Sequence, residues 1–66
     1  MTAREVARRI IRLGGIEVAS KGSHRRYRVP GCSTIVAFHP GDIPIGTLRS
    51  IERDMEPCYG PGWLTR

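Results

Sequence analysis

Apolar and polar positions recur with two different periods along this chain. Between residues 2 and 14 the apolar positions recur every three or four residues, the spacing of one face of an α-helix. These positions are Ala3, Val6, Ala7, Ile10 and Leu13. Thr2 and Glu5 have the spacing of a capping box, and Gly14 with Gly15 provides a helix end. The pattern predicts an amphipathic helix over residues 2–14.

From residue 16 onward the period falls to two, which is typical of β-strands. We expect strands over residues 16–20, 24–29 and 33–38, with turns at residues 21–23 and 30–31. In the middle strand, one face carries His24, Arg26 and Arg28, and the other carries Arg25, Tyr27 and Val29. Since Tyr27 alternates with Val29, we expect it to pack in the core rather than to stack on a nucleobase.

A second helix is predicted to start near residues 43–45, where Pro44 suits the first turn, and to stop at Pro57. Its apolar face would comprise Ile45, Leu48, Ile51 and Met55. The residues expected in the core from the two helices include Ile10, Leu13, Ile45, Leu48 and Ile51. The tail, about residues 57–66, is expected to be irregular, with Trp63 and Leu64 packing back on the core.

These elements predict an α+β fold of the order α-β-β-β-α, in a single domain over residues 1–66. Two helices can cover one face of a three-stranded antiparallel sheet and leave the other face open. A chain of 66 residues builds only a small core, so a bound partner can add much to its stability.

The charge of the chain adds a nucleic-acid partner to this interpretation. Eleven Lys and Arg residues face six Asp and Glu residues, and all of the cations except Lys21 are Arg. The guanidinium group matches phosphate oxygens and stacks on bases, so a nucleic-acid partner is indicated. Arg4, Arg8 and Arg12 form a stripe on the first helix that can contact a phosphate backbone or simply face solvent.

Cys32 and Cys58 lack the CxxC spacing of a zinc site, so no metal site is predicted. One pair of cysteines is not a disulfide framework, but a single disulfide is possible if the chain is secreted. The first fourteen residues lack the apolar stretch of a signal peptide, and no segment is apolar enough to cross a bilayer. We therefore expect a cytoplasmic protein with free thiols and no membrane association. No Gly-rich phosphate loop is present, and no cofactor is predicted.

Candidate chemistry lies at Lys21-Gly22-Ser23-His24. Lys21 offers a charge, Ser23 a hydroxyl, and Gly22 a backbone that a ligand can approach closely. An imidazole titrates near neutral pH, so His24 can take a proton from a ribose 2′-hydroxyl or give one to a leaving 5′-oxygen. Arg26 and Arg28 can stabilise charge growing on phosphorus. The alternative is a hairpin turn with an exposed histidine that has no role.

The second histidine, His39, can act as another acid or base or as a substrate contact, if the strands bring it near His24. The alternative is a strand-end histidine bonded only to backbone.

Several of these features together resemble the HicA toxins of HicAB toxin–antitoxin systems. They are the helix ending in two glycines, the Gly22-Ser23-His24 motif, His39, and the segment Gly46-Thr47-Leu48-Arg49-Ser50-Ile51. The resemblance covers about residues 3–53, and the Pro- and Gly-containing tail departs from it.

The resemblance implies a fold like a double-stranded-RNA-binding domain, metal-independent cleavage of messenger RNA, and a HicB-like antitoxin that covers the catalytic histidine. It places that histidine at His24. Gly22 and Ser23 fall on the motif before it, and His39 falls on the recurrent histidine before the second helix. Lys21, Arg26 and Arg28 complete the expected substrate-binding set. The rival interpretations are a non-catalytic RNA-binding module and a subunit that only binds its partner.

Overall fold

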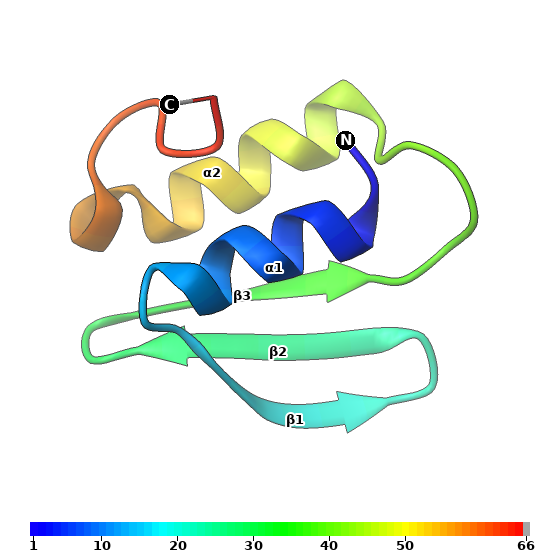
Figure 1. The fold of residues 1–66 in the computed structure, drawn as a ribbon, viewed down its shortest axis with the longest axis horizontal. Coiled ribbons are helices and arrows are strands. Elements are labelled where there is room, and N and C mark those ends of the chain that lie inside the picture. The colour runs from blue at the N-terminus through cyan, green and yellow to red at the C-terminus, as the bar shows by residue number, and fades with distance from the viewer. Residues whose placement is uncertain (66) are drawn as a thin grey trace.

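The computed structural model describes residues 1–65 and has the order α1 (Ala3–Arg12), β1 (Ile16–Lys21), β2 (His24–Val29), β3 (Cys32–Ala37) and α2 (Ile45–Tyr59). The strands form one antiparallel sheet in the order β1-β2-β3. Both helices lie on one side of the sheet, close to β3, and β1 is the strand farthest from them (Figure 1). The predicted α-β-β-β-α fold is confirmed.

Helix α1 begins and ends where the local signals indicate. The Thr2 amide donates to Glu5 Oε1 at 2.8 Å, and the Glu5 amide donates to Thr2 Oγ1 at 3.2 Å, which completes the predicted capping box. Gly14 follows the helix with φ of 92°, a conformation that side chains disfavour. A Cβ at Gly15 would collide with Ile10, so the chain can turn this closely only at a glycine.

The sheet has one covered face and one open face. Tyr27 in β2 and its partner Thr34 in β3 point toward the helices and are buried, with 1% and 3% of their surfaces exposed. The Thr34 hydroxyl donates to Asp54 Oδ2 of α2 at 2.9 Å and so ties the sheet to that helix. All six residues of β1 are exposed, and the register shifts between Glu17 and Ala19. The helices therefore cover mainly β2 and β3.

Two residues expected in the core lie outside it. Leu13 is 44% exposed and Ile45 is 67% exposed, whereas Ile10 and Ile51 are buried as predicted and Leu48 is partly buried. Both misplaced residues sit at helix ends. Leu13 is the C-cap of α1 and Ile45 is the first residue of α2, and at such positions helical spacing does not by itself imply contact with the core.

Helix α2 does not stop at Pro57, as predicted, but continues to Tyr59. Pro57 lacks the amide that would donate to the carbonyl four residues earlier, but the helix continues for two more residues despite the loss of this bond. The helix ends at Gly60, which has φ of 88° and whose amide donates to the Glu56 carbonyl at 2.7 Å. The predicted start near residues 43–45 is correct, with Pro44 directly before the first helical residue.

The tail packs back on the core as predicted. Trp63 and Leu64 are 2% and 5% exposed. The Trp63 indole nitrogen donates to the Glu52 carbonyl at 2.8 Å, and its ring meets Tyr59 edge-on with centroids 5.1 Å apart.

The prediction of free thiols is wrong for this structure, because Cys32 and Cys58 form a disulfide. They are 26 positions apart in sequence, but packing of α2 on β3 brings their Cα atoms to 6.3 Å, within the usual range for a disulfide. The bonded form is the one that an oxidising environment favours. In a reducing cytosol the same geometry would place two thiols side by side.

Candidate functional site

His24 is the first residue of β2 and follows a tight turn. Lys21 and His24 are cross-strand partners on either side of Gly22 and Ser23. Gly22 has φ of 60°, the positive value that the first position of a type II′ hairpin turn requires. The Ser23 carbonyl accepts a 2.7 Å hydrogen bond from the Phe38 amide, so the turn is fastened to the end of β3. The His24 side chain is exposed on the open face of the sheet.

The strand register brings His39 to His24, as the sequence argument required. His24 pairs with Ala37, and His39 follows two residues later. The two imidazole rings meet edge to face with centroids 6.3 Å apart. The His39 amide donates to the Ala37 carbonyl at 3.2 Å, and the residue is exposed. Two titratable rings from different segments therefore share one accessible region.

A shallow hollow of about 300 Å³ joins His24 to two of the predicted cations, Lys21 and Arg26. Ala19, Ser20 and Ile35 complete its lining. Arg26 lies two residues beyond His24 on the same face, about 7 Å along the strand. This arrangement can hold a phosphate between an imidazole and two positive charges.

Arg28 is not part of that hollow. It lines a separate depression with Gly14, Ile16 and Pro30, near the opposite end of β2. Of the predicted substrate-binding residues, Lys21 and Arg26 thus lie beside His24, Gly22 and Ser23 form the turn before it, and His39 lies across from it. Arg28 can contact only a more distant part of a long ligand.

Sequence reasoning missed Ile35, the residue of β3 that faces Arg26 across the strands. It is 44% exposed and forms an apolar floor beside the charges. Alternation within β3 placed it on the open face, but only the cross-strand register puts it next to His24 and Arg26.

Arg25, on the covered face, was also missed. Its guanidinium lies 4.1 Å from the centre of the Phe38 ring and 3.9 Å from Glu17 Oε1. It thus supports the segment that leads to His39.

The covered face also shows why Tyr27 is structural. Its hydroxyl donates to Glu17 Oε1 at 3.1 Å, and burial, followed by this bond, raises the pKa of the phenol. The expectation that Tyr27 packs in the core is confirmed.

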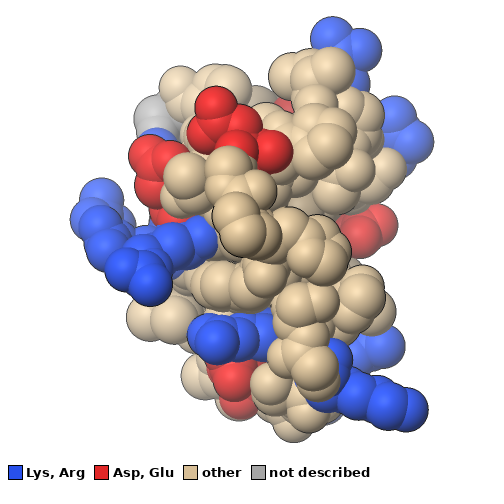
Figure 2. Space-filling model, turned by 90° about the vertical axis from the view of Figure 1, so that its right-hand side faces the viewer, with Lys and Arg blue, Asp and Glu red and all other residues tan. Residues whose placement is uncertain are grey.

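The end of the molecule that carries the turn and the β3–α2 loop is seen face on in Figure 2. Uncharged side chains form its middle, and Lys and Arg side chains lie along its margins together with several Asp and Glu side chains. The stripe of Arg4, Arg8 and Arg12 on α1 is exposed as well. Positive charge is therefore spread over several elements, with acidic side chains between, rather than forming one compact patch.

The protein belongs to the class of basic α-β-β-β-α proteins with an open sheet face, and it carries a histidine at the mouth of its middle strand. Comparison with protein families narrows this class. Residues 3–56 match the family described as the HicA toxin of bacterial toxin–antitoxin systems. Because the match spans most of the 66 residues, the chain belongs to the HicA toxin family.

Membership of this family gives the chain a toxin role and implies a cognate antitoxin. A search of curated proteins found no match. Among residues 1–65, neither helix has the length and apolar character needed to cross a membrane.

Proposed function

We propose that this toxin is an endoribonuclease that cleaves messenger RNA without a metal, with His24 as its general base. The observation that carries the proposal is the position of His24. It is exposed at the mouth of β2, lies 6.3 Å from the His39 ring between centroids, and lines a hollow with Lys21 and Arg26. The family match supports the toxin role, and messenger RNA as the target is what the resemblance to HicA toxins implies.

In the proposed reaction, the His24 imidazole removes the proton from a ribose 2′-hydroxyl. The 2′-oxygen then bonds to the adjacent phosphorus as the bond from phosphorus to the 5′-oxygen breaks. Lys21 and Arg26 stabilise the negative charge that grows on the phosphoryl oxygens. Water reaches this exposed site and supplies a proton to the leaving 5′-oxygen. The products are a 2′,3′-cyclic phosphate, or its hydrolysis product, and a free 5′-hydroxyl.

Gly22, Ser23, His39 and Arg28 are assigned to substrate binding. Ser23 offers a hydroxyl beside His24, and His39 contacts the substrate across the site. Arg28 contacts a phosphate farther along the strand, because it lines a different depression. The substrate implies action in the cytoplasm, where messenger RNA is translated.

We propose further that a HicB-like antitoxin covers His24 and the open sheet face. That face exposes Ile16 and Ile35 at 57% and 44%, beside Arg26 and Arg28. A partner with apolar side chains and carboxylates would complement both features.

Incubation of the purified protein with a defined transcript in EDTA tests the nuclease proposal. We expect fragments with 2′,3′-cyclic phosphate or phosphate ends, identified by mass spectrometry. Retention of intact RNA without fragments would instead support a non-catalytic RNA-binding module. Failure both to cut and to bind RNA would leave a subunit that binds only its partner.

A further inference from the structure

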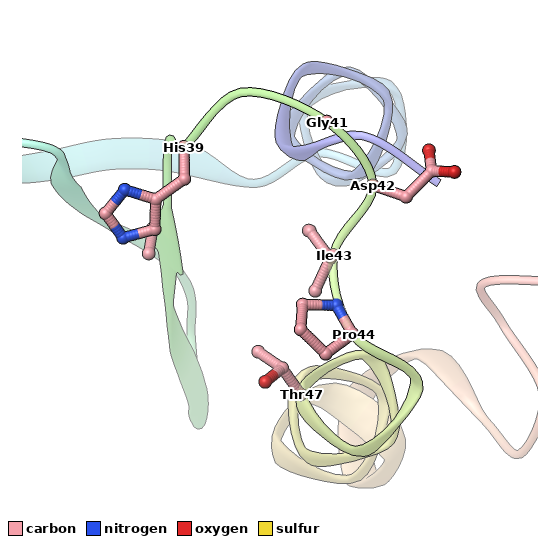
Figure 3. Close-up of a pocket in the computed structure, with 7 residues that line it drawn as sticks. His39, Gly41, Asp42, Ile43, Pro44 and Thr47 are labelled. Carbon is pink, nitrogen blue, oxygen red and sulfur yellow. The ribbon is translucent and has the colours of Figure 1, made fainter.

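A cavity next to the histidines has no role in the reaction described above. It lies between the end of β3 and the start of α2 and has a volume of about 290 Å³, close to the lower limit for small-ligand sites. Figure 3 shows the His39 ring on one side and Ile43, Pro44 and Thr47 on the other. The ring is seen face on in this view, so the cavity is a slot between the edge of an imidazole and a largely apolar wall.

The one acidic residue among those that line the cavity is turned away from it. In Figure 3 the Asp42 carboxylate points to the side opposite His39. It lies 3.6 Å from the N-terminal amine, an ion pair that holds the charge outward. The slot therefore presents ring and methyl surfaces with one hydroxyl, that of Thr47, and does not repel a polyanion.

These walls suit a nucleobase. A base has two flat faces that stack on aromatic or apolar side chains and an edge that needs hydrogen-bond partners. Ile43 and Pro44 offer a surface on which one face of a base can stack, the edge of the His39 imidazole lies across the slot from them, and the Thr47 hydroxyl can bond to the edge of the base. Unstacked bases of this kind are available only in single-stranded RNA or loops.

The slot also lies close to the proposed catalytic histidine. His39 forms one of its walls and is the ring that meets His24, so the slot opens beside the position where the proposed mechanism puts the phosphate. We propose that it binds one unstacked base of single-stranded RNA, on a nucleotide adjacent to the scissile phosphate, and so selects the cleavage position. This inference rests on the proposed nuclease function and adds the determinant of its specificity.

The test uses a single-stranded RNA with 2′-O-methyl groups, which cannot be cleaved by attack of a 2′-hydroxyl. One abasic nucleotide is moved along its length, and the affinity of the protein is measured at each position. We expect one position at which loss of the base weakens binding by about 5- to 100-fold, the usual contribution of one stacked base.

Variants of Thr47 then test whether the base at that position binds in the slot. Thr47 is exposed on the first turn of α2, so Thr47→Phe should fill the slot without unfolding the protein, and Thr47→Leu fills it less. Both should remove the dependence on the abasic position, and Thr47→Phe should also alter the cut sites on a natural transcript. Thr65→Phe is the matched control, because it places the same ring at an exposed threonine outside the slot.

Uniform affinity along the abasic scan, in a protein that cuts RNA, overturns the slot while leaving the nuclease proposal intact. The slot is also overturned if Thr47→Phe and Thr47→Leu are folded by circular dichroism and their affinity still depends on the abasic position as in the wild type. If the two variants weaken only antitoxin binding, the slot belongs to the partner and the inference fails. Absence of both RNA binding and cleavage in the wild type overturns the nuclease proposal and this inference together.

Discussion

Covalent bonding and aromatic packing hold one end of the sheet, whereas the opposite end carries exposed histidines and an open slot. At the first end, the disulfide joins Cys32 of β3 to Cys58 of α2, and Trp63 packs on the neighbouring Tyr59. At the second end, a backbone bond from Phe38 to Ser23 fastens the turn, and His24 remains exposed.

In this chain of 66 residues, the end of the sheet that stabilises the fold is therefore not the end that carries the proposed reactive groups. The free energy of unfolding of a small domain is low. If the same residues had to form the core and also expose polar groups for a reaction, the domain would be less stable. Here the groups that bury surface and the groups proposed to react lie on different parts of the sheet. Changes at one end should therefore leave the properties of the other end largely intact.

The largest expected effect on stability comes from breaking the disulfide. Reduction, or Cys58→Ser, should lower the free energy of unfolding by about 3–4 kcal/mol. The reason is that a disulfide between residues 26 positions apart restricts the conformations of the unfolded chain. Urea unfolding of the oxidised and reduced protein measures the change. The reductant should have no effect on Cys58→Ser, which serves as the control. An unchanged midpoint on reduction would show that this bond does not hold the first end.

Binding of the antitoxin should stabilise the toxin from its open face. A partner that binds only the folded state at about 100 times its dissociation constant adds about 2.7 kcal/mol. Thermal scans of the toxin with and without the candidate partner measure this. Charge-reversal variants of the partner's carboxylates should weaken the shift. A midpoint that stays the same at saturating partner would contradict the assignment of this face.

RNA affinity should fall as salt rises. If Lys21, Arg26 and Arg28 each contact a phosphate of a single strand, affinity should drop about 20-fold between 50 and 200 mM salt. Titration of the uncleavable RNA at several salt concentrations gives the slope. Arg28→Gln should make the slope of log affinity against log salt shallower by about 0.7, the value for one phosphate contact of a single strand. The cut sites should not change. Salt-independent affinity would show that the open face does not bind RNA through these charges.

The smallest effect concerns Tyr27, which belongs to neither end. Tyr27→Phe removes the hydrogen bond to Glu17 and should cost about 1 kcal/mol at neutral pH. Burial raises the pKa of Tyr27, so the folded state favours the neutral phenol. Its contribution is complete below the unfolded value of about 10 and is lost as pH rises through the folded value.

Unfolding measured from pH 8 to 11 should therefore show a smaller alkaline loss of stability in Tyr27→Phe than in the wild type. Tyr59, whose pKa burial also raises, remains in both proteins, so part of the alkaline loss should persist in the variant. Identical profiles for the two proteins would remove Tyr27 from the alkaline transition.

Elements with local signals were predictable from the sequence. Thr2 and Glu5 marked the start of α1 because a capping box involves neighbouring residues. Alternation in β2 placed His24 on the open face and Tyr27 in the core, since the helices cover only one face of the sheet. Whether His39 approaches His24 was left open by the sequence, and the pairing of His24 with Ala37 decides it.

Features that depend on distant packing were not predictable. Periodicity does not show which residues at the ends of a helix reach the core, so Leu13 and Ile45 were misplaced. The pairing of Cys32 with Cys58 depends on how α2 lies across β3. The separation of Arg28 from the hollow beside His24 depends on the shape of the surface between strands, which alternation does not contain.

The most direct test of the central claim is the rate of RNA cleavage by His24→Ala, measured beside its unfolding free energy. The account predicts a rate lower by about 10² to 10⁴. It also predicts a change in stability within about 1 kcal/mol, because His24 is exposed at the open end. A folded His24→Ala protein that cuts a defined transcript at the wild-type rate would contradict the claim. An unfolded one would show that His24 supports the fold instead.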